Sequence, residues 1–515
     1  DQALAFQVRL AQARTELVSG SPSEAQRQLE ELRPRTRTRA DMVAVYILTQ
    51  DIHFATGEFL EGMNSMLECL SLLGMPVSPH PTWEEAVAAH EEVWALLGPR
   101  SIQSLLELPL MTDPDMKMAV LAHYRLFPVA YNTDPHLLII LLSRVVSLTL
   151  RHGVVDDAVG GYAWFGVITS AFFKRHREGL AFARLALGVV ERHHFSVDRG
   201  SVFLGVQLNS YWVQPLPHAQ EIALNGLHHA LQAGDVAAAC YCSVSLFSNR
   251  LAMGHSLDEV HQESLVRGEY LRKTGSVDFQ DWLLLGQRYV QQLRGHSLSF
   301  STLSGEGFDE RAYEARLTPG RTLSTQSTYW VYKMQSRFMC GAYQEACEAA
   351  DQMIRVLWAP CGTLHAREGH FYRALTLAAC FEGASPEQQR EWLEAIERHH
   401  QQLAQWAENC PENFRALERL VSAERARLGG RTEEATQAYD EAIRAARENG
   451  ATHYAGLASE LAANFWRTRK APLVAHFFAR EARAAYQQWG ARAKVQHLES
   501  LWPELASTQS PQDAL

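Results

Sequence analysis

The segment TEEATQAYDEAIRAAR at residues 432–447 decides the fold class of this chain. Its small and aromatic residues recur at the spacing of one face of an α-helix. Thr432 is predicted to cap the start of this helix, and Glu433 and Glu434 suit the positive end of the helix dipole. Asn449 and Gly450 supply a stop signal. The predicted buried stripe consists of Ala435, Tyr439, Ala442, Ile443 and Ala446.

A similar helix follows 40 residues later, at 474–489, and Gly490 ends it. Alanines alternate with aromatic rings on both stripes, which favours close helix packing with the rings filling the gaps. Looser copies occur elsewhere at periods of about 37–44 residues, near the tetratricopeptide range. The second stripe is Val474, Phe478, Ala482, Ala485, Tyr486 and Trp489. The matched positions are Leu417 with Leu457, Val421 with Leu461, Ala423 with Ala463, Ala435 with Ala475, Ala442 with Ala482, and Gly450 with Gly490.

These repeats predict an all-α fold, because signals for β-strands are nearly absent. We expect an α-solenoid of about twelve tetratricopeptide-like helix pairs, wound into a right-handed superhelix. Residues 74–83, with three prolines, are predicted to form a loop. The expected organisation is an N-terminal helical-repeat half at 1–296, an irregular insertion or hinge at 297–327, a C-terminal repeat half at 328–505, and a frayed tail at 506–515.

Composition narrows the class of protein. The 515 residues are 47% apolar and 21% charged, with a net charge of −10. This balance fits a globular chain and argues against a general nucleic-acid binder or anionic-membrane binder. No apolar run approaches about 20 residues, so we expect no membrane insertion. Eight scattered cysteines favour a reducing cytoplasm. Because the chain starts at Asp1 without Met, we expect it to be a piece of a longer protein.

Motifs for catalysis are missing from the sequence. Neither a phosphate-binding loop nor a kinase or hydrolase signature occurs. The stretch HAREGH at 365–370 lacks the spacing of a zinc motif, and Cys240 and Cys242 lie about 200° apart on a predicted helix. We therefore expect no catalytic residue, no metal site and no cofactor in this segment.

Aromatic residues are dense in the middle of the chain. Aromatic walls with a few polar groups suit a site for a peptide or small ligand. The alternative interpretation is packing between adjacent repeats. Replacing Trp212 with alanine would separate the two, since a core residue destabilises the fold while a site residue only weakens binding. The candidate contacts for a ligand or partner are Trp212, Asn249, Arg250, Arg294 and Trp330.

A basic run near the N-terminus alternates arginine with proline and threonine. Pro34 disfavours helix at Arg33, so an exposed turn between helices is one interpretation. The other is a docking patch for an acidic partner. The arginines are Arg33, Arg35, Arg37 and Arg39.

Several longer phrases resemble the helical region of a family of large bacterial signalling proteins. That family combines a serine/threonine kinase, a STAND-type AAA ATPase and a sensor histidine kinase. The resemblance runs from about Gly57 to Pro503, and WAENCPENF and WGARAKV are its most specific parts. The phrases are RSIQSLLELPLMTDPDMK (100–117), SLTLRHG (147–153), GYAWFG (161–166), SYWVQPL (210–216), GDVAAACYCSVSLFSNRLAMG (234–254), LRG (293–295), FDERAYEARL (308–317), LAQWAENCPENF (403–414) and YQQWGARAKVQHLE (486–499).

This resemblance implies a non-catalytic sensor and protein-interaction region. The expected partner is a protein or peptide, a small effector, or the parent's own ATPase and kinase domains, and binding would regulate those domains in the cytoplasm. The resemblance assigns no catalytic residue to this region. A free-standing adaptor, an oligomerisation scaffold and an α-helical toroid enzyme are the alternatives.

The alanine stripe makes a testable prediction. The substitution Ala442→Phe should overpack the seam between repeats and lower the free energy of unfolding by about 1–3 kcal/mol. Thermal or denaturant unfolding measures this change. An unchanged melting temperature would place Ala442 outside the seam.

Overall fold

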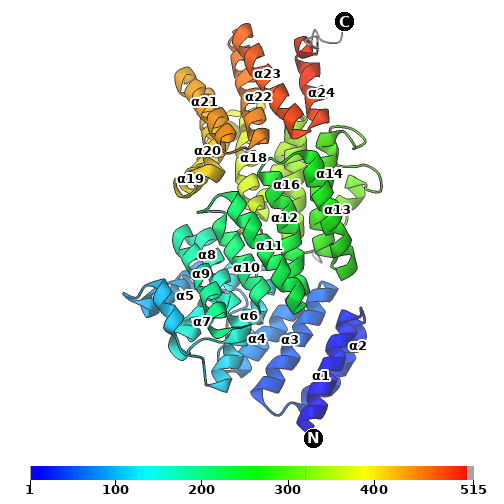
Figure 1. The fold of residues 1–515 in the computed structure, drawn as a ribbon, viewed down its shortest axis with the longest axis vertical. Coiled ribbons are helices and arrows are strands. Elements are labelled where there is room, and N and C mark those ends of the chain that lie inside the picture. The colour runs from blue at the N-terminus through cyan, green and yellow to red at the C-terminus, as the bar shows by residue number, and fades with distance from the viewer. Residues whose placement is uncertain (1, 196–197, 319–320, 507–515) are drawn as a thin grey trace. The chain divides into compact units, whose positions relative to one another are not determined.

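The computed structural model describes residues 2–195, 198–318 and 321–506. Within these ranges the chain forms 24 α-helices and no β-strand, and its only extended pairings are two isolated bridges. The all-α helical-repeat class is therefore confirmed (Figure 1). No described helix is both long and apolar enough to cross a bilayer. Of the predicted tail, only Ala506 lies inside the described residues.

Two compact units make up the chain. Unit 1 is Asp1–Asn209 with Thr318–Leu323. Its consecutive helices pack as hairpins, such as α1 with α2, α3 with α4, and α8 with α9. The helices are α1 (Gln2–Val18), α2 (Pro22–Leu32), α3 (Arg39–Thr56), α4 (Phe59–Leu72), α5 (Trp83–Leu97), α6 (Pro114–Ala130), α7 (Pro135–His152), α8 (Gly160–Phe173), α9 (His176–His193) and α10 (Arg199–Ser210).

Unit 2 is Ser210–Leu317 with Ser324–Leu515 and contains the repeats that decided the fold class. Its hairpins include α11 with α12, α20 with α21, and α22 with α23. The helices are α11 (Leu216–Ala233), α12 (Val236–Ala252), α13 (Leu257–Thr274), α14 (Val277–Arg294), α15 (Glu310–Glu314), α16 (Leu323–Met339), α17 (Tyr343–Arg355), α18 (Leu364–Cys380), α19 (Pro386–Asn409), α20 (Pro411–Leu428), α21 (Thr432–Glu448), α22 (Thr452–Thr468), α23 (Pro472–Trp489) and α24 (Arg492–Leu501).

The repeat helices end at the glycines that the sequence predicts, but the predicted N-cap of α21 is wrong. Gly450 and Gly490 adopt the left-handed conformation at φ 68° and 88°, as a glycine stop requires. Thr432 is not the N-cap, because α21 begins at Thr432 and Arg431 holds the capping position without a side-chain hydrogen bond. The Thr432 hydroxyl instead accepts a hydrogen bond from Arg469 of the next hairpin at 3.3 Å.

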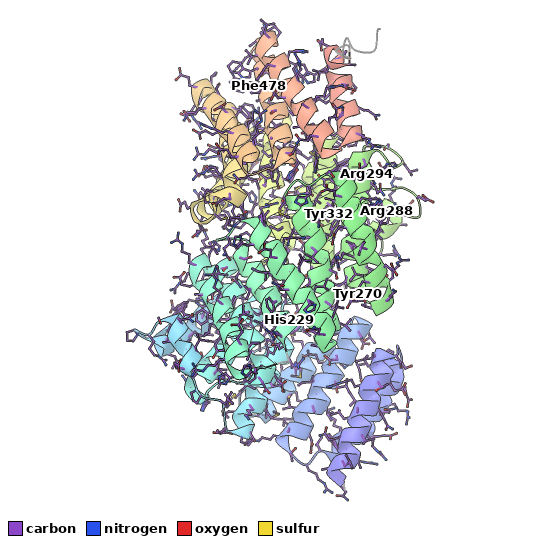
Figure 2. The ribbon with its side chains drawn as sticks, viewed as in Figure 1. His229, Tyr270, Arg288, Arg294, Tyr332 and Phe478 are labelled. Carbon is purple, nitrogen blue, oxygen red and sulfur yellow. The ribbon has the colours of Figure 1, made fainter. Side chains whose placement is uncertain are left out.

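The predicted buried stripe of alanines and aromatic rings is confirmed in α21 and is partly wrong in α23. Ala442 and Ala482 are fully buried, and Tyr439 and Tyr486 beside them are at most 1% exposed. Val474, however, is 40% exposed, and Phe478, marked in Figure 2, is half-buried. The buried face of α23 is Ala475, Ala479, Ala482, Tyr486 and Trp489. The predicted stripe is therefore wrong in the first half of this helix, where Ala475 and Ala479 are the buried residues.

An irregular segment joins α14 to α16 and contains the five-residue helix α15. Glu310 in α15 is buried and forms a double ion pair with Arg337 of α16, with both N–O distances at 2.8 Å. Its carboxylate also accepts hydrogen bonds from Thr302 and the amide of Leu303. The segment is thus fastened to α16 by a buried carboxylate. The predicted boundary at 297–327 falls mostly inside unit 2, and a hinge there stays a prediction.

A second buried ion pair lies in the WGARAKV phrase. Lys494 of α24 is 3% exposed, and its Nζ donates to Glu460 of α22 at 2.7 Å. The same nitrogen donates to the carbonyl of Met339, the last residue of α16, at 2.8 Å. Tyr486 of α23 donates to the other carboxylate oxygen of Glu460 at 2.7 Å. One lysine therefore links α16, α22 and α24.

The substitution Lys494→Met should lower the free energy of unfolding by about 3–5 kcal/mol, because it leaves Glu460 buried without its cation. Chemical denaturation measures the change. Lys273→Met is the matched control, since Lys273 forms an exposed pair with Glu269 within α13. The control should unfold like the unmodified chain. Equal stability of the two variants would contradict a role for the buried pair.

Candidate functional site

A clasp joins the start of α11 to the start of α20 in unit 2. It consists of Tyr211, Trp212, Gln214 and Leu216 on one side and Trp406, Asn413 and Phe414 on the other. The side-chain amide of Asn413 donates to the carbonyls of Tyr211 and Gln214, both at 2.8 Å. Its oxygen accepts from the amide of Leu216 at 3.0 Å. The clasp therefore brings SYWVQPL and WAENCPENF together.

Behind the clasp lies the Arg367 cavity, which has a volume of about 310 Å³. This is the lower end of the size range of small-ligand pockets. Its wall is mainly apolar, with a few polar groups. The lining residues are Pro215, Leu216, Pro217, Ala252, Met253, Gly254, His255, Arg367, Glu412, Asn413, Ala416, Leu417, Ala445, Ala446, Asn449, Gly450, Ala451 and Tyr454.

Arg367 of α18 and Glu412 of α20 are charged residues of this wall; Glu412 is exposed, whereas Arg367 is only 1% exposed. Its Nη2 and Nε donate to Glu368 at 2.5 and 2.9 Å, and Nη2 also donates to the hydroxyl of Tyr454 at 3.1 Å. Tyr454 in turn donates to the same oxygen of Glu368 at 2.8 Å, while Gln335 donates to the other oxygen at 2.9 Å. None of the described residues accepts a hydrogen bond from Nη1 of Arg367.

On the other side of Tyr454 is the central cavity, which is smaller, at about 40 Å³. That volume holds a few water molecules. It is lined by rings from several helices, among them Tyr332 of α16, marked in Figure 2. His453 and Trp489 also line it, and the Nδ1 of His453 and the Nε1 of Trp489 are buried without a partner among the described residues. Buried polar atoms of this kind usually contact ordered water or a ligand.

Burial and the arginine charge set the protonation of this region. Burial, with a further contribution from Arg367, lowers the pKa of His453 to about 3. Burial lowers the pKa of His365, which lines the central cavity, to about 4. Burial by itself lowers the pKa of Arg367, but Tyr454 and Glu368 more than compensate and raise it. At neutral pH the arginine is therefore charged and both histidines are neutral.

Two of the predicted contact residues lie in the interior near the clasp. Trp212 is 3% exposed and packs on Trp406 and Phe414, with ring centroids 4.7 and 5.7 Å away. Asn249 is fully buried and accepts a hydrogen bond from the Tyr211 hydroxyl at 2.6 Å. The structure thus connects these two residues through Tyr211. Neither lines the Arg367 cavity or the central cavity.

The other three predicted contact residues are spread over unit 2. Arg250 pairs with Glu263 at 3.3 Å, and Arg294, marked in Figure 2, pairs with Asp258 at 2.7 Å, so both fasten α13 to a neighbouring helix. Trp330 is half-buried beside Lys333, whose ammonium lies 5.3 Å from its ring centroid. The five residues are not gathered around one cavity, and their role in binding stays a prediction.

The basic run is exposed and connects α2 to α3 in unit 1, as one interpretation predicted. The expected lack of helix at Arg33 is wrong, because Arg33–Arg35 form a short 3-10 helix, and Arg39 is already the first residue of α3. Arg33 pairs with Glu68 at 3.3 Å and Arg39 with Asp115 at 2.9 Å. Arg35 and Arg37 form no side-chain ion pair with described residues and line a surface groove of about 830 Å³ with Arg9. Binding of an acidic partner here stays a prediction.

Sequence reasoning missed Arg367, Glu368 and Tyr454. Arg367 and Glu368 stand in the HAREGH stretch, which drew attention only through its two histidines. The sequence feature that could have identified them is an adjacent Arg–Glu pair in a predicted helix whose C-terminal part is largely apolar. In the part of the chain that the structure describes, no group of three or more His, Cys, Asp or Glu side chains could hold a metal ion.

Comparisons with known proteins give limited similarities. No protein-family model matches the chain. A stretch of 178 residues is 25% identical to hybrid signal transduction histidine kinase G of Dictyostelium discoideum, and it covers 34% of this chain and 5% of that protein. Among solved structures, a Rap protein complexed with competence and sporulation factor aligns at a TM-score of 0.41 and 9% identity, over 86% of this chain and 98% of its own. Neither similarity assigns a family.

The packing of Trp212 in the clasp predicts that Trp212→Ala destabilises the fold. We expect a loss of about 3–5 kcal/mol in the free energy of unfolding, because a buried ring that contacts two others is removed. Denaturant unfolding measures it. Phe477→Ala is the control, since Phe477 is 58% exposed on α23 and its loss should change stability little. A Trp212→Ala variant that is as stable as this control but loses ligand or partner binding would instead support a binding role for the tryptophan.

Proposed function

We propose that this chain is a non-catalytic sensor and interaction region, and that it binds a peptide segment or a small effector in the Arg367 cavity. The observation that carries this proposal is a 310 Å³ cavity whose wall contains a buried arginine, one nitrogen of which has no acceptor among the described residues. A peptide carbonyl or carboxylate oxygen is the complementary acceptor. The volume suits one or two residues of an extended peptide or a molecule of similar size.

Signalling in a larger protein is the second part of the proposal. The resemblance of the phrases between Gly57 and Pro503 to helical regions of ATPase and kinase proteins supports it, as does the partial similarity to a signal transduction histidine kinase. Binding would regulate the linked domains only if the chain adopts two arrangements that differ in affinity for the ligand. Reading the gene upstream of Asp1 would distinguish this role from that of a free-standing adaptor. An open reading frame with ATPase motifs would support the signalling role.

A scaffold for another protein is the alternative function, and one observation favours it. The outer face of α23 exposes Leu473, Val474 and Phe477, at 87%, 40% and 58%. Adjacent exposed apolar side chains often mark a protein-binding surface. This face does not line the Arg367 cavity, so the two functions can be tested separately.

Filling the cavity tests the proposed binding function. Ala416 of α20 lines the cavity and is half-buried, so Ala416→Phe places a ring in the ligand space. Short peptides and metabolites are screened by thermal shift, and hits are measured by calorimetry. We expect a ligand to stabilise the unmodified chain, by about 2.7 kcal/mol at one hundred times its Kd, and to lose most of its affinity for Ala416→Phe.

The matched control is Ala237→Phe, which adds the same ring at an exposed position of α12 in the same unit. This variant should bind the ligand as the unmodified chain does. Both variants must first show the helical circular dichroism of the unmodified chain. A ligand that binds Ala416→Phe and Ala237→Phe equally well would place its site outside the Arg367 cavity and overturn the proposal.

A further inference from the structure

Two cysteines meet in the hairpin of α17 and α18. The Sγ of Cys347, in the second turn of α17, lies 3.1 Å from the Sγ of Cys380, the last residue of α18. The two residues are 33 positions apart in the sequence. A disulfide bond is about 2.05 Å long, so the sulfur atoms need to approach by only about 1 Å to form one. No other pair of sulfur atoms makes such a contact among the described residues.

The two thiols differ in their surroundings. Cys347 is 7% exposed, and its thiol donates a hydrogen bond to the sulfur of Cys380. Cys380 is half-buried, and its thiol donates a hydrogen bond to the carbonyl of Tyr343 at 3.3 Å. The hydrogen bond from Cys347 lowers the pKa of Cys380, while the same bond and burial raise the pKa of Cys347. Cys380 is therefore the more accessible thiol and the one that more readily forms the thiolate.

We propose that Cys347 and Cys380 are a redox pair that hydrogen peroxide converts reversibly into a disulfide. The thiolate of Cys380 attacks one oxygen of the peroxide, which breaks the O–O bond, forms a sulfenic acid and releases hydroxide. The sulfur of Cys347 then gives up its proton and attacks the sulfur of Cys380. The S–S bond forms, the S–O bond breaks, and a second hydroxide leaves. The two thiol protons convert both hydroxides to water, so two thiols lose two electrons to one peroxide.

The position of the pair gives this reaction a structural consequence. The disulfide would tie the beginning of α17 to the end of α18 and close a loop that contains Arg367 and Glu368. Closing such a loop restricts the unfolded chain and raises the melting temperature. This inference does not depend on a ligand in the Arg367 cavity, because it concerns only the thiols and an oxidant.

Thiol counting on the full chain tests the proposal. The protein is reduced, freed of reductant, treated with one equivalent of hydrogen peroxide, denatured and titrated with a thiol reagent. We expect the eight thiols to fall by two, and dithiothreitol to restore them. Mass spectrometry of a non-reduced digest should find one linked peptide joining Cys347 to Cys380, and the melting temperature should rise on oxidation.

Three variants assign the roles of the two thiols. In Cys347→Ser the sulfenic acid on Cys380 should persist and be trapped by dimedone, whereas Cys380→Ser should keep all its remaining thiols. Cys410→Ser is the control, because it removes a buried cysteine outside the pair and should still lose two thiols. An undiminished thiol count in the unmodified chain, a linkage between other cysteines, or sulfonic acid at Cys380 without linkage would each overturn the proposal.

Discussion

Close packing of a small residue against an aromatic ring is the constraint on which unit 2 depends. A Cβ added to Gly286 of α14 would lie 2.3 Å from the ring of Phe247 in α12. At Gly456 of α22 it would lie 3.0 Å from the ring of Tyr486 in α23. These distances are below ordinary contact, so the helices approach as closely as their backbones and rings allow. The buried alanines of α21 and α23 allow similarly close packing. The tyrosine rings of these helices are buried as well, so their hydroxyl groups lie in the interior.

Those buried hydroxyls need hydrogen-bond acceptors, and the fold supplies them as carboxylates. Tyr454 donates to Glu368, Tyr486 donates to Glu460, and each carboxylate is then paired with a buried cation, Arg367 or Lys494. A buried ion pair adds little net stability compared with apolar packing, but losing one partner is costly, so such pairs specify one arrangement of the helices. Arg367 differs from Lys494 because one of its nitrogens has no acceptor in the part of the chain that the structure describes, and because it lines a cavity.

Local features of unit 2 could be predicted from the sequence, because a helix shows its buried face through periodicity. The helices at 432–447 and 474–489, their glycine ends and the burial of Ala442 and Ala482 all follow from neighbours in the chain. The clasp could not, since Asn413 bonds to residues about 200 positions away and nothing in its own helix marks that role. Trp212 was selected because aromatic and polar residues suit a binding site, yet the same composition suits a core.

The helix α18 contains residues of both the proposed binding site and the proposed redox pair. Arg367 and Glu368 lie near its start, and Cys380 is its last residue. At 1.5 Å per residue, the arginine and the cysteine are separated by about 20 Å along the helix axis. A ligand bound at Arg367 can therefore affect Cys380, or the reverse, only by shifting the whole of α18. The fully buried residues along it, among them Phe371 and Thr376, resist such a shift, so any coupling would require the seams around α18 to have a second packing of comparable free energy.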